Sequence, residues 1–198
     1  TQHDGAEPAT ALEPPAPQPT PPAAADHHPR PLRIALLGNP NTGKTTLFNR
    51  LSGLRHKTSN FPGTTQARAP RTAELIDLPG IYSLELDLSE SAVCRGVLAG
   101  TLAPAGERAA APDAVCIVVD STNLGRNLLL VGEALRRRLP TVGILIMTDL
   151  ARRRGLAIHI DALAERLGCR VLAASARTGE GLDELPAALA AAVIPNRT

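Results

Sequence analysis

The sequence predicts an α/β fold in which a mostly parallel, six-stranded sheet is flanked by helices. From Leu32 onward, short apolar runs alternate with longer segments of helical period, a pattern typical of strand–helix–strand units. Two of the apolar runs end at an aspartate, Asp77 and Asp120, and the first run leads into a glycine-rich turn. Because open parallel sheets bind ligands at the carboxyl ends of their strands, we expect the functional site at that edge.

Each element follows from a local pattern. Strands are expected where apolar runs are bounded by turn residues, and helices where a 3.6-residue period stops at glycine or proline. The expected strands are Leu32–Leu37, Ala73–Ile76, Ala114–Val119, Thr141–Met147 and Arg170–Ala174, and the expected helices are Lys44–Ser52, Ser89–Leu102, Leu124–Leu139, Asp161–Leu167 and Gly181–Val193.

The sixth strand is expected at the sheet edge, antiparallel to the strand that begins at Ala73. The stretch between Thr65 and Asp77 is short and is interrupted by Pro70. Two paired strands and a turn barely fit into it, so we expect a stunted edge strand and a loose loop before Thr65.

The two ends of the chain differ from this body. Half of the 18 prolines lie in residues 1–31, together with alanine, threonine and a net negative charge. Such a segment cannot bury enough apolar surface to offset the entropy of ordering, so we expect a disordered tail. Residues 32–194 are expected to form one domain, and residues 195–198 its C-terminal end. A Pro-x-x-Pro spacing from Pro14 to Pro17 leaves open a recruiting role for the tail.

Composition excludes several classes of partner. The formal net charge is +2, and the chain contains Phe48, Phe61, Tyr82 and no tryptophan, so we expect no nucleic-acid partner. The longest apolar runs are far shorter than the roughly 20 residues that span a bilayer, so no membrane span is expected. Three widely spaced cysteines indicate a reducing, cytoplasmic setting without disulfides.

The stretch from Gly38 to Thr45 fits the phosphate-loop pattern G-x-x-x-x-G-K-[ST], between an expected strand and an expected helix. Backbone N–H groups and the helix N-terminus suit phosphates, Lys44 reaches the β- and γ-phosphates, and the Thr45 hydroxyl suits Mg²⁺. Lys44 is one of only two lysines in the chain. The predicted nucleotide ligands here are Gly38, Asn39, Pro40, Asn41, Thr42, Gly43, Lys44, Thr45 and Thr46.

Two further elements suit a nucleoside triphosphate. Asp77 begins an Asp-x-x-Gly element, in which its carboxylate holds Mg²⁺ through water and the Gly80 N–H meets the γ-phosphate. Thr65 ends the Asn60–Thr65 segment and is placed to complete the Mg²⁺ shell. The predicted catalytic residues are therefore Lys44, Thr65 and Gly80, and the predicted magnesium ligands are Thr45, Thr65 and Asp77.

Taken together, GNPNTGKTTLFN, NFPGTT, DLPGIYSL, VVDSTNLGRNLLL and SARTGEGLDEL resemble the cytosolic G domain of the ferrous-iron transport protein B (FeoB) family, over about residues 32 to 192. The resemblance implies a Ras-like P-loop GTPase that binds GTP or GDP with Mg²⁺ and hydrolyses GTP slowly. It implies that Asn41 helps to hold a potassium ion beside the phosphates. It also implies a switch linked to ferrous iron transport.

The chain ends at Thr198, without the family's helical domain and membrane pore. We therefore expect a stand-alone G domain that is cytoplasmic or peripheral at the inner face of the membrane. Its expected partner is a separate membrane permease or a regulatory protein.

Two positions bear on activity. Gly80 is followed by Ile81, where Ras-type enzymes have a glutamine, so no side-chain base is expected there. The family's base-reading element is N-x-x-D, whereas this chain has Ile146 ahead of Asp149. Asp149 can accept from guanine N1–H and the exocyclic amine, but Ile146 cannot brace the site, which predicts a loss of about 1–3 kcal/mol of affinity. Met147 and the loop Ser175, Ala176 and Arg177 are the other expected base contacts.

These departures leave an alternative open. The chain could be a non-hydrolysing regulatory or scaffold domain that keeps the fold and the phosphate loop but has lost turnover through Ile146 and the short edge region. A third reading is an interaction module that is recruited through its proline-rich tail.

Overall fold

The computed structural model describes residues 31–52, 65–69, 73–103 and 109–193. The tail apart from Pro31, the Asn60–Thr64 segment and Pro70 therefore lie outside the described residues. The strands are β1 (Leu32–Gly38), β2 (Thr65–Ala69), β3 (Ala73–Asp77), β4 (Ala114–Asp120), β5 (Thr141–Ile146) and β6 (Arg170–Ala173). The helices are α1 (Lys44–Ser52), α2 (Ser89–Leu98), the 3₁₀ turn η1 (Ser121–Asn123), α3 (Leu124–Arg136), α4 (Thr148–Arg153), α5 (Ile160–Leu167) and α6 (Leu185–Val193).

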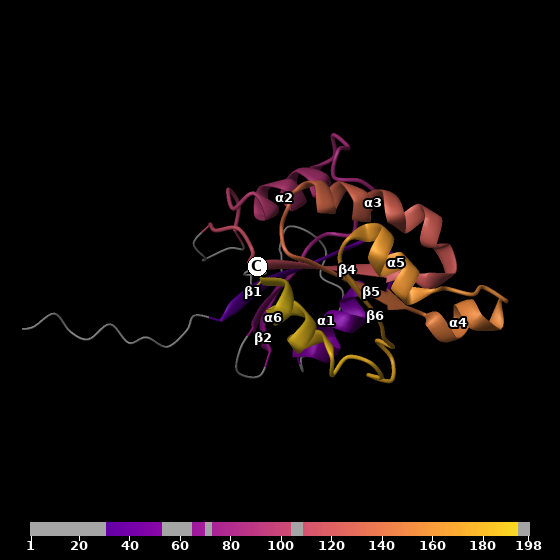
Figure 1. The fold of residues 1–198 in the computed structure, drawn as a ribbon. Helices are drawn as coiled ribbons and strands as arrows, with labels where there is room; N and C mark the ends of the chain where they lie inside the picture. Colours follow the sequence, from indigo (N-terminus) through magenta and orange to yellow (C-terminus); the bar gives the residue numbers. More distant parts are fainter. Residues whose placement is uncertain (1–30, 53–64, 70–72, 104–108, 194–198) are drawn as a thin grey trace, which may run out of the picture.

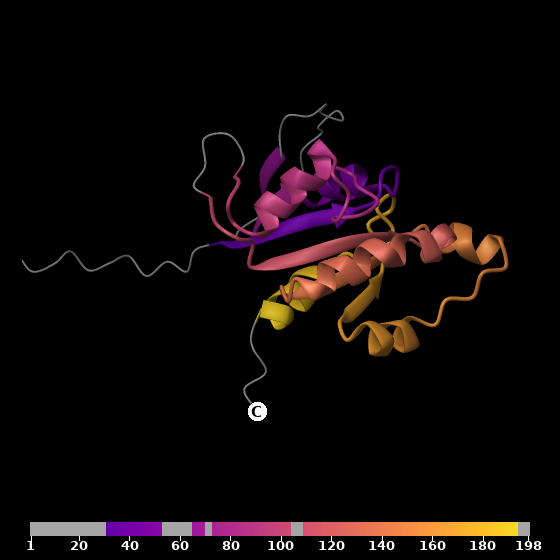
Figure 2. The ribbon, with the colours of Figure 1, turned by 90° about the horizontal axis from the view of Figure 1, so that it is seen from above.

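The strands form one six-stranded sheet in the order β2-β3-β1-β4-β5-β6. Neighbouring strands are parallel except for β2, which runs antiparallel to β3. Helices α2, α3 and α5 pack on one face, and α1 and α6 on the other (Figure 1). Figure 2 looks from above onto the face that carries α2 and α3, which lie across the strands in this view. The predicted fold class is confirmed.

The central strand β4 shows why the apolar runs are continuous. Alternate residues such as Cys116 and Val118 join the core under α1 and α6, whereas Ile117 and Val119 join the core under α2 and α3. A strand that is covered on both faces needs apolar side chains at every position, so its pattern does not alternate.

The edge strand corrects one expectation. β2 pairs with β3 along its whole length, from Thr65 opposite Asp77 to Ala69 opposite Ala73. The strand is therefore not stunted but has a length ordinary for strands. The interval suffices because Thr65 and Asp77 are themselves the ends of the two strands, and β2 ends directly before Pro70.

Other boundaries differ at helix ends. The helix expected to reach Leu102 stops at Leu98, because Gly100 adopts a left-handed conformation at φ 71°. The helix expected to reach Leu139 stops at Arg136, shortly before Arg138 turns to φ 57°. α6 begins at Leu185 rather than Gly181, since Gly181 lies in a tight approach to the backbone of Ala173 with φ 74°.

Helix α4 has no counterpart in the sequence prediction. Its six residues contain one buried residue, Ala151, so the segment carries no apolar period that would indicate a helix. Within the ranges that the structure describes, none of the helices has the length and apolar character needed to cross a membrane.

Candidate functional site

The phosphate-loop residues connect β1 to α1. Asn41 and Gly43 both adopt left-handed conformations, at φ 63° and 80°. The Thr42 hydroxyl donates to the Asn39 carbonyl oxygen at 2.9 Å, and the Leu47 N–H donates to the Gly43 carbonyl oxygen at 3.0 Å to begin the helix. Successive backbone amides in such a turn form an anion-binding concavity at a helix N-terminus.

Lys44 and Asp77 meet beside this loop. The Lys44 ammonium donates to Oδ1 of Asp77, and the Lys44 residue is only 7% exposed. Burial raises the pKa of Asp77 above its ordinary value, and the nearby positive charge of Lys44 offsets part of that effect. The first turn of α1 and the end of β3 therefore bring the predicted phosphate-binding lysine and the predicted magnesium carboxylate into one site.

The residues that follow β3 pack against the phosphate loop. The Leu78 N–H donates to the Leu36 carbonyl oxygen at 3.1 Å, and the Ile81 N–H donates to the Gly38 carbonyl oxygen at 3.2 Å. A Cβ atom at Gly80 would stand 3.0 Å from Cα of Pro40, so only glycine fits this approach without displacement. The predicted residue Gly80 thus lies against the loop.

The side chain of Ile81 is buried in the core under α2 and α3, with 4% of the residue exposed. This position therefore offers no polar side chain to the phosphate site, as the sequence predicts.

A buried carboxylate on α3 anchors the same segment. Glu133 is 3% exposed and accepts hydrogen bonds from the Ser83 hydroxyl at 2.7 Å and the Leu84 N–H at 2.5 Å. The Ser91 hydroxyl of α2 donates to the Ser83 carbonyl oxygen at 2.8 Å. Sequence reasoning missed these residues, although a glutamate among the apolar positions of an amphipathic helix is a usable signal for a buried polar contact.

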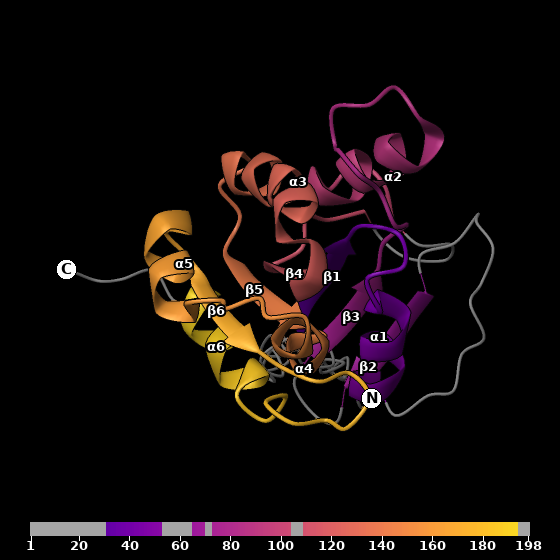
Figure 3. The ribbon, with the colours of Figure 1, turned by 90° about the vertical axis from the view of Figure 1, so that its right-hand side faces the viewer.

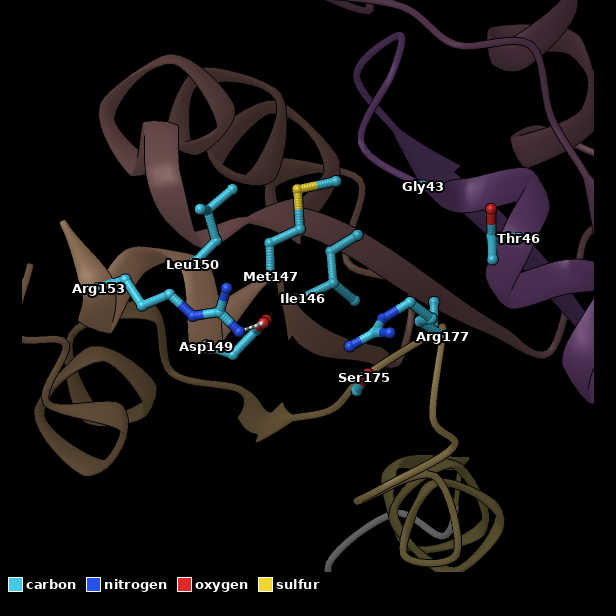
Figure 4. A pocket seen from close by; sticks show the side chains of 10 residues that line it. Gly43, Thr46, Ile146, Met147, Asp149, Leu150, Arg153, Ser175 and Arg177 are labelled. Carbon is cyan, nitrogen blue, oxygen red and sulfur yellow. Dashed lines mark hydrogen bonds and ion pairs between the residues drawn. The ribbon is translucent and has the colours of Figure 1, made fainter.

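A pocket of about 610 Å³ lies beside the phosphate loop at the carboxyl ends of the strands (Figure 4). Figure 3 looks onto this end of the sheet, where α4 and the loop before α6 face the viewer. The pocket brings together all five residues predicted to contact a base with two residues of the phosphate loop and α1. Its lining consists of Gly43, Thr46, Ile146, Met147, Asp149, Leu150, Arg153, Ser175, Ala176 and Arg177.

Asp149 has a partner that the sequence analysis did not identify. Arg153, one turn further along α4, places Nη2 at 3.3 Å from Oδ2 of Asp149 within the pocket lining (Figure 4). Both side chains are largely exposed, at 73% and 57%. The i, i+4 spacing on a helix was the available signal, but recognising it required knowing that Thr148–Arg153 is helical.

Ile146 ends β5 and is 1% exposed in the core under α1 and α6. Its Cδ1 atom lies 3.1 Å from the place that a Cβ on Gly43 would occupy. The residue therefore supports the phosphate loop by apolar packing, where the family pattern has a hydrogen-bonding asparagine. Met147 follows in a left-handed conformation at φ 57°, which carries the chain into α4.

The magnesium ligands can be placed in part. Thr65 lies opposite Asp77 in the β2–β3 register, so the backbone of Thr65 is beside the C-terminal end of β3. Thr45 follows Lys44 in the first turn of α1. A hydroxyl and a carboxylate fit Mg²⁺, which takes oxygen ligands and commonly completes its shell with water and substrate phosphates.

Comparisons with known proteins identify the family of the chain. Residues 32–189 match the family model described as ferrous iron transport protein B. The Fe(2+) transporter FeoB of Escherichia coli K12 is 38% identical over 170 residues, which are 80% of this chain and 21% of the transporter. The chain thus spans about a fifth of the length of that relative.

Solved structures are similar over most of the chain. The FeoB G domain from Methanococcus jannaschii is 32% identical, with a TM-score of 0.69, over 83% of this chain and 98% of that chain. An S. thermophilus NFeoB variant bound to GDP and AlF₄⁻ is 35% identical, with a TM-score of 0.70, over 82% of this chain and 63% of that chain. The chain therefore belongs to the ferrous iron transport protein B family and has the Ras-like fold of its G domain.

Proposed function

We propose that residues 32–194 form a G domain that binds GTP and GDP with Mg²⁺, hydrolyses GTP slowly and acts as a switch linked to ferrous iron transport. The observation that carries the proposal is the continuity of one site. The base-reading candidate Asp149 and the phosphate-loop residue Gly43 line the same pocket, beside the Lys44–Asp77 pair. Structures of S. thermophilus NFeoB with GDP, GDP and AlF₄⁻, and GMPPNP support the choice of ligand.

At the phosphate end of the site, positively charged and N–H donor groups would bind the negatively charged phosphates. The amides of residues 38–45 bind phosphate oxygens, and Lys44 exchanges Asp77 for the β- and γ-phosphates. Thr45, Thr65 and Asp77 hold Mg²⁺, which neutralises phosphate charge when it is bound. Asn41, which is exposed and has a left-handed backbone at φ 63°, would help to hold a potassium ion beside the phosphates, and that ion would stimulate hydrolysis.

Hydrolysis would proceed without a side-chain base after Gly80. The Ile81 side chain is directed into the core, so the attacking water is held by backbone groups, and the Gly80 N–H meets the γ-phosphate. Lys44 would then meet the negative charge that develops on the phosphate in the transition state, and the cations would supply further positive charge when bound. Catalysis by positioning and charge alone is the reason that we propose slow turnover.

The base end would select guanine. The Asp149 carboxylate accepts from N1–H and the exocyclic amine, and the loop of Ser175, Ala176 and Arg177 meets the remaining edge of the ring. Met147 packs against the base from the pocket lining. An adenine ring presents neither of the two donors that Asp149 would accept.

The link to iron rests on the family. The relative in Escherichia coli K12 is named an Fe(2+) transporter. We propose that the domain acts at the cytoplasmic face of the membrane with a ferrous iron permease or a regulatory protein as its partner.

A non-hydrolysing nucleotide-binding domain is the second candidate, and the burial of Ile146 at the base-reading position favours it. Steady-state GTP hydrolysis with Mg²⁺, in potassium and in sodium buffer, separates the two. We expect turnover of GTP but not ATP, faster in potassium, and none with Lys44→Ala. GDP binding without GTP turnover in either salt would establish the second candidate instead.

A further inference from the structure

Arg50 connects the phosphate helix to the base loop. It lies in the last turn of α1, and its side chain is directed at the loop before α6. Nη1 donates to the Arg177 carbonyl oxygen at 3.1 Å, and Nη2 donates to the Thr178 carbonyl oxygen. One guanidinium group therefore holds two consecutive carbonyls of a loop that is distant in sequence, a geometry that suits its planar fork of donors.

The backbone at Gly179, in the loop before α6, leaves room for the Arg50 guanidinium. Gly179 adopts φ 89°, and a Cβ atom at this position would fall within the Arg50 guanidinium. The absence of a side chain at Gly179 thus allows the guanidinium to lie directly on the backbone.

Within the loop, most donors are already used. The Ser175 N–H donates to the Glu180 carbonyl oxygen at 2.9 Å, and the Gly179 N–H donates to the Ser175 carbonyl oxygen at 2.8 Å. The Thr178 N–H donates to the Ser175 hydroxyl oxygen at 3.1 Å. Among the residues that the structure describes, the N–H groups of Ala176 and Arg177 make no such bond, and both residues line the base pocket.

Guanine supplies the matching acceptor. Asp149, a carboxylate, can meet only the N1–H and exocyclic amine donors of the ring. The O6 atom next to N1 is an acceptor, and it requires a donor from another part of the pocket. The N–H groups of Ala176 and Arg177 are the candidates that the loop offers.

We propose that Arg50 is a positioning residue that holds the Ser175–Thr178 loop so that its N–H donors meet guanine O6. The inference rests on the proposed binding of guanine nucleotides. Because α1 also carries Lys44 and Thr45, a single helix sets the spacing between the phosphate end of the site and the O6 donors. Arg50 thereby ties base recognition to the phosphate helix without touching the nucleotide.

The positioning role of Arg50 is tested by comparing how the unaltered chain and Arg50 variants bind nucleotides that differ at O6 of the base. GDP is compared with 6-thioguanosine diphosphate, in which sulfur replaces O6, and with inosine diphosphate, which lacks the exocyclic amine. For the unaltered chain we expect the thio ligand to bind roughly 3- to 10-fold more weakly than GDP, the loss typical of one hydrogen bond. With Arg50→Ala we expect GDP to bind about 3- to 10-fold more weakly and the thio ligand to bind about as well as GDP.

The inosine ligand separates positioning from general damage. Its penalty relative to GDP reports on Asp149, so it should be the same in the unaltered chain and in Arg50→Ala. Arg50→Lys keeps the charge but loses the fork, and should behave like Arg50→Ala. Arg166→Ala, the same change at an exposed arginine of α5, should match the unaltered chain for all three ligands.

Wild-type GDP affinity in Arg50→Ala, or an undiminished penalty for the thio ligand, would overturn the positioning role. Equal binding of GDP and the thio ligand by the unaltered chain would overturn the O6 contact. An unaltered chain that binds no GDP would instead contradict the proposed function, on which this inference depends.

Discussion

The Arg153 guanidinium lies 3.3 Å from the Asp149 carboxylate, so the residue proposed to read guanine already has an ionic partner in its own helix. Both side chains are largely exposed, at 73% and 57%, and exposed pairs of this kind contribute little to stability. The base must therefore share or replace a weak contact. If Asp149 reads guanine as proposed, Arg153 would compete with the base for the carboxylate.

Removal of this competitor should tighten binding slightly. We expect Arg153→Gln to lower the dissociation constant for GDP by up to about fivefold, the equivalent of an exposed ion pair, with a smaller effect in high salt. Titration of a fluorescent GDP analogue at two ionic strengths measures the change. Arg152→Gln on the same helix is the control, because Arg152 does not line the base pocket. A loss of more than tenfold in Arg153→Gln would mean that Arg153 contacts the nucleotide itself.

Ile146→Asn should exchange stability for affinity. An asparagine restores the hydrogen-bonding group of the family pattern, and we expect GDP to bind about 1–3 kcal/mol more tightly. The buried position should cost roughly 2–4 kcal/mol of unfolding free energy in the absence of nucleotide. Denaturant unfolding and GDP titration measure the two effects.

The control for this exchange is Ile144→Asn, at another fully buried residue of β5. It should destabilise the domain without any gain in affinity. Unchanged or weaker GDP binding by Ile146→Asn would refute the view that Ile146 limits the site.

Gly80→Ala should separate hydrolysis from GDP binding. The added Cβ would approach Cα of Pro40 to 3.0 Å and displace the segment that follows β3. Because Gly80 is proposed to meet the γ-phosphate, we expect GTP turnover to fall at least roughly tenfold while GDP affinity changes little.

Gly125→Ala is the matched control, since a Cβ there meets no atom within 4 Å. Its turnover should equal that of the unaltered chain. If Gly80→Ala hydrolysed GTP at the normal rate, the proposed contact with the γ-phosphate would be wrong.

Asp77 should make the nucleotide-free domain less stable as pH rises. Burial raises its pKa above the ordinary 3.8, so the folded state binds the proton more tightly than the unfolded state does. The stabilisation that this provides is fully present below pH 3.8 and is lost as pH rises through the raised pKa of the folded state.

The contribution of Asp77 to stability is measured by denaturant unfolding of the unaltered chain and of Asp77→Asn, from below pH 3.8 to above the raised pKa of the folded state. The difference in unfolding free energy between the two should shift against the unaltered chain as pH rises. A difference that stays constant with pH would show that Lys44 fully compensates for the burial of the carboxylate.

The sequence alone predicts those features that depend on residues adjacent in the chain. The continuous apolar run of β4 and the phosphate-loop pattern before Lys44 each follow from adjacent residues, so both could be predicted. Contacts that join distant segments could not. Arg50 meets Thr178 only because α1 and the loop before α6 reach the same end of the sheet, and Glu133 meets Ser83 only because α3 packs beside the segment after β3.

The most direct test of guanine recognition is the affinity of the unaltered chain and of Asp149→Asn for GDP and for xanthosine diphosphate. Xanthine presents an acceptor where guanine carries the exocyclic amine, and an asparagine amide can donate to it. We expect the unaltered chain to prefer GDP and Asp149→Asn to prefer the xanthine nucleotide. The same preference in both proteins would contradict the account, because Asp149 would then not read the base.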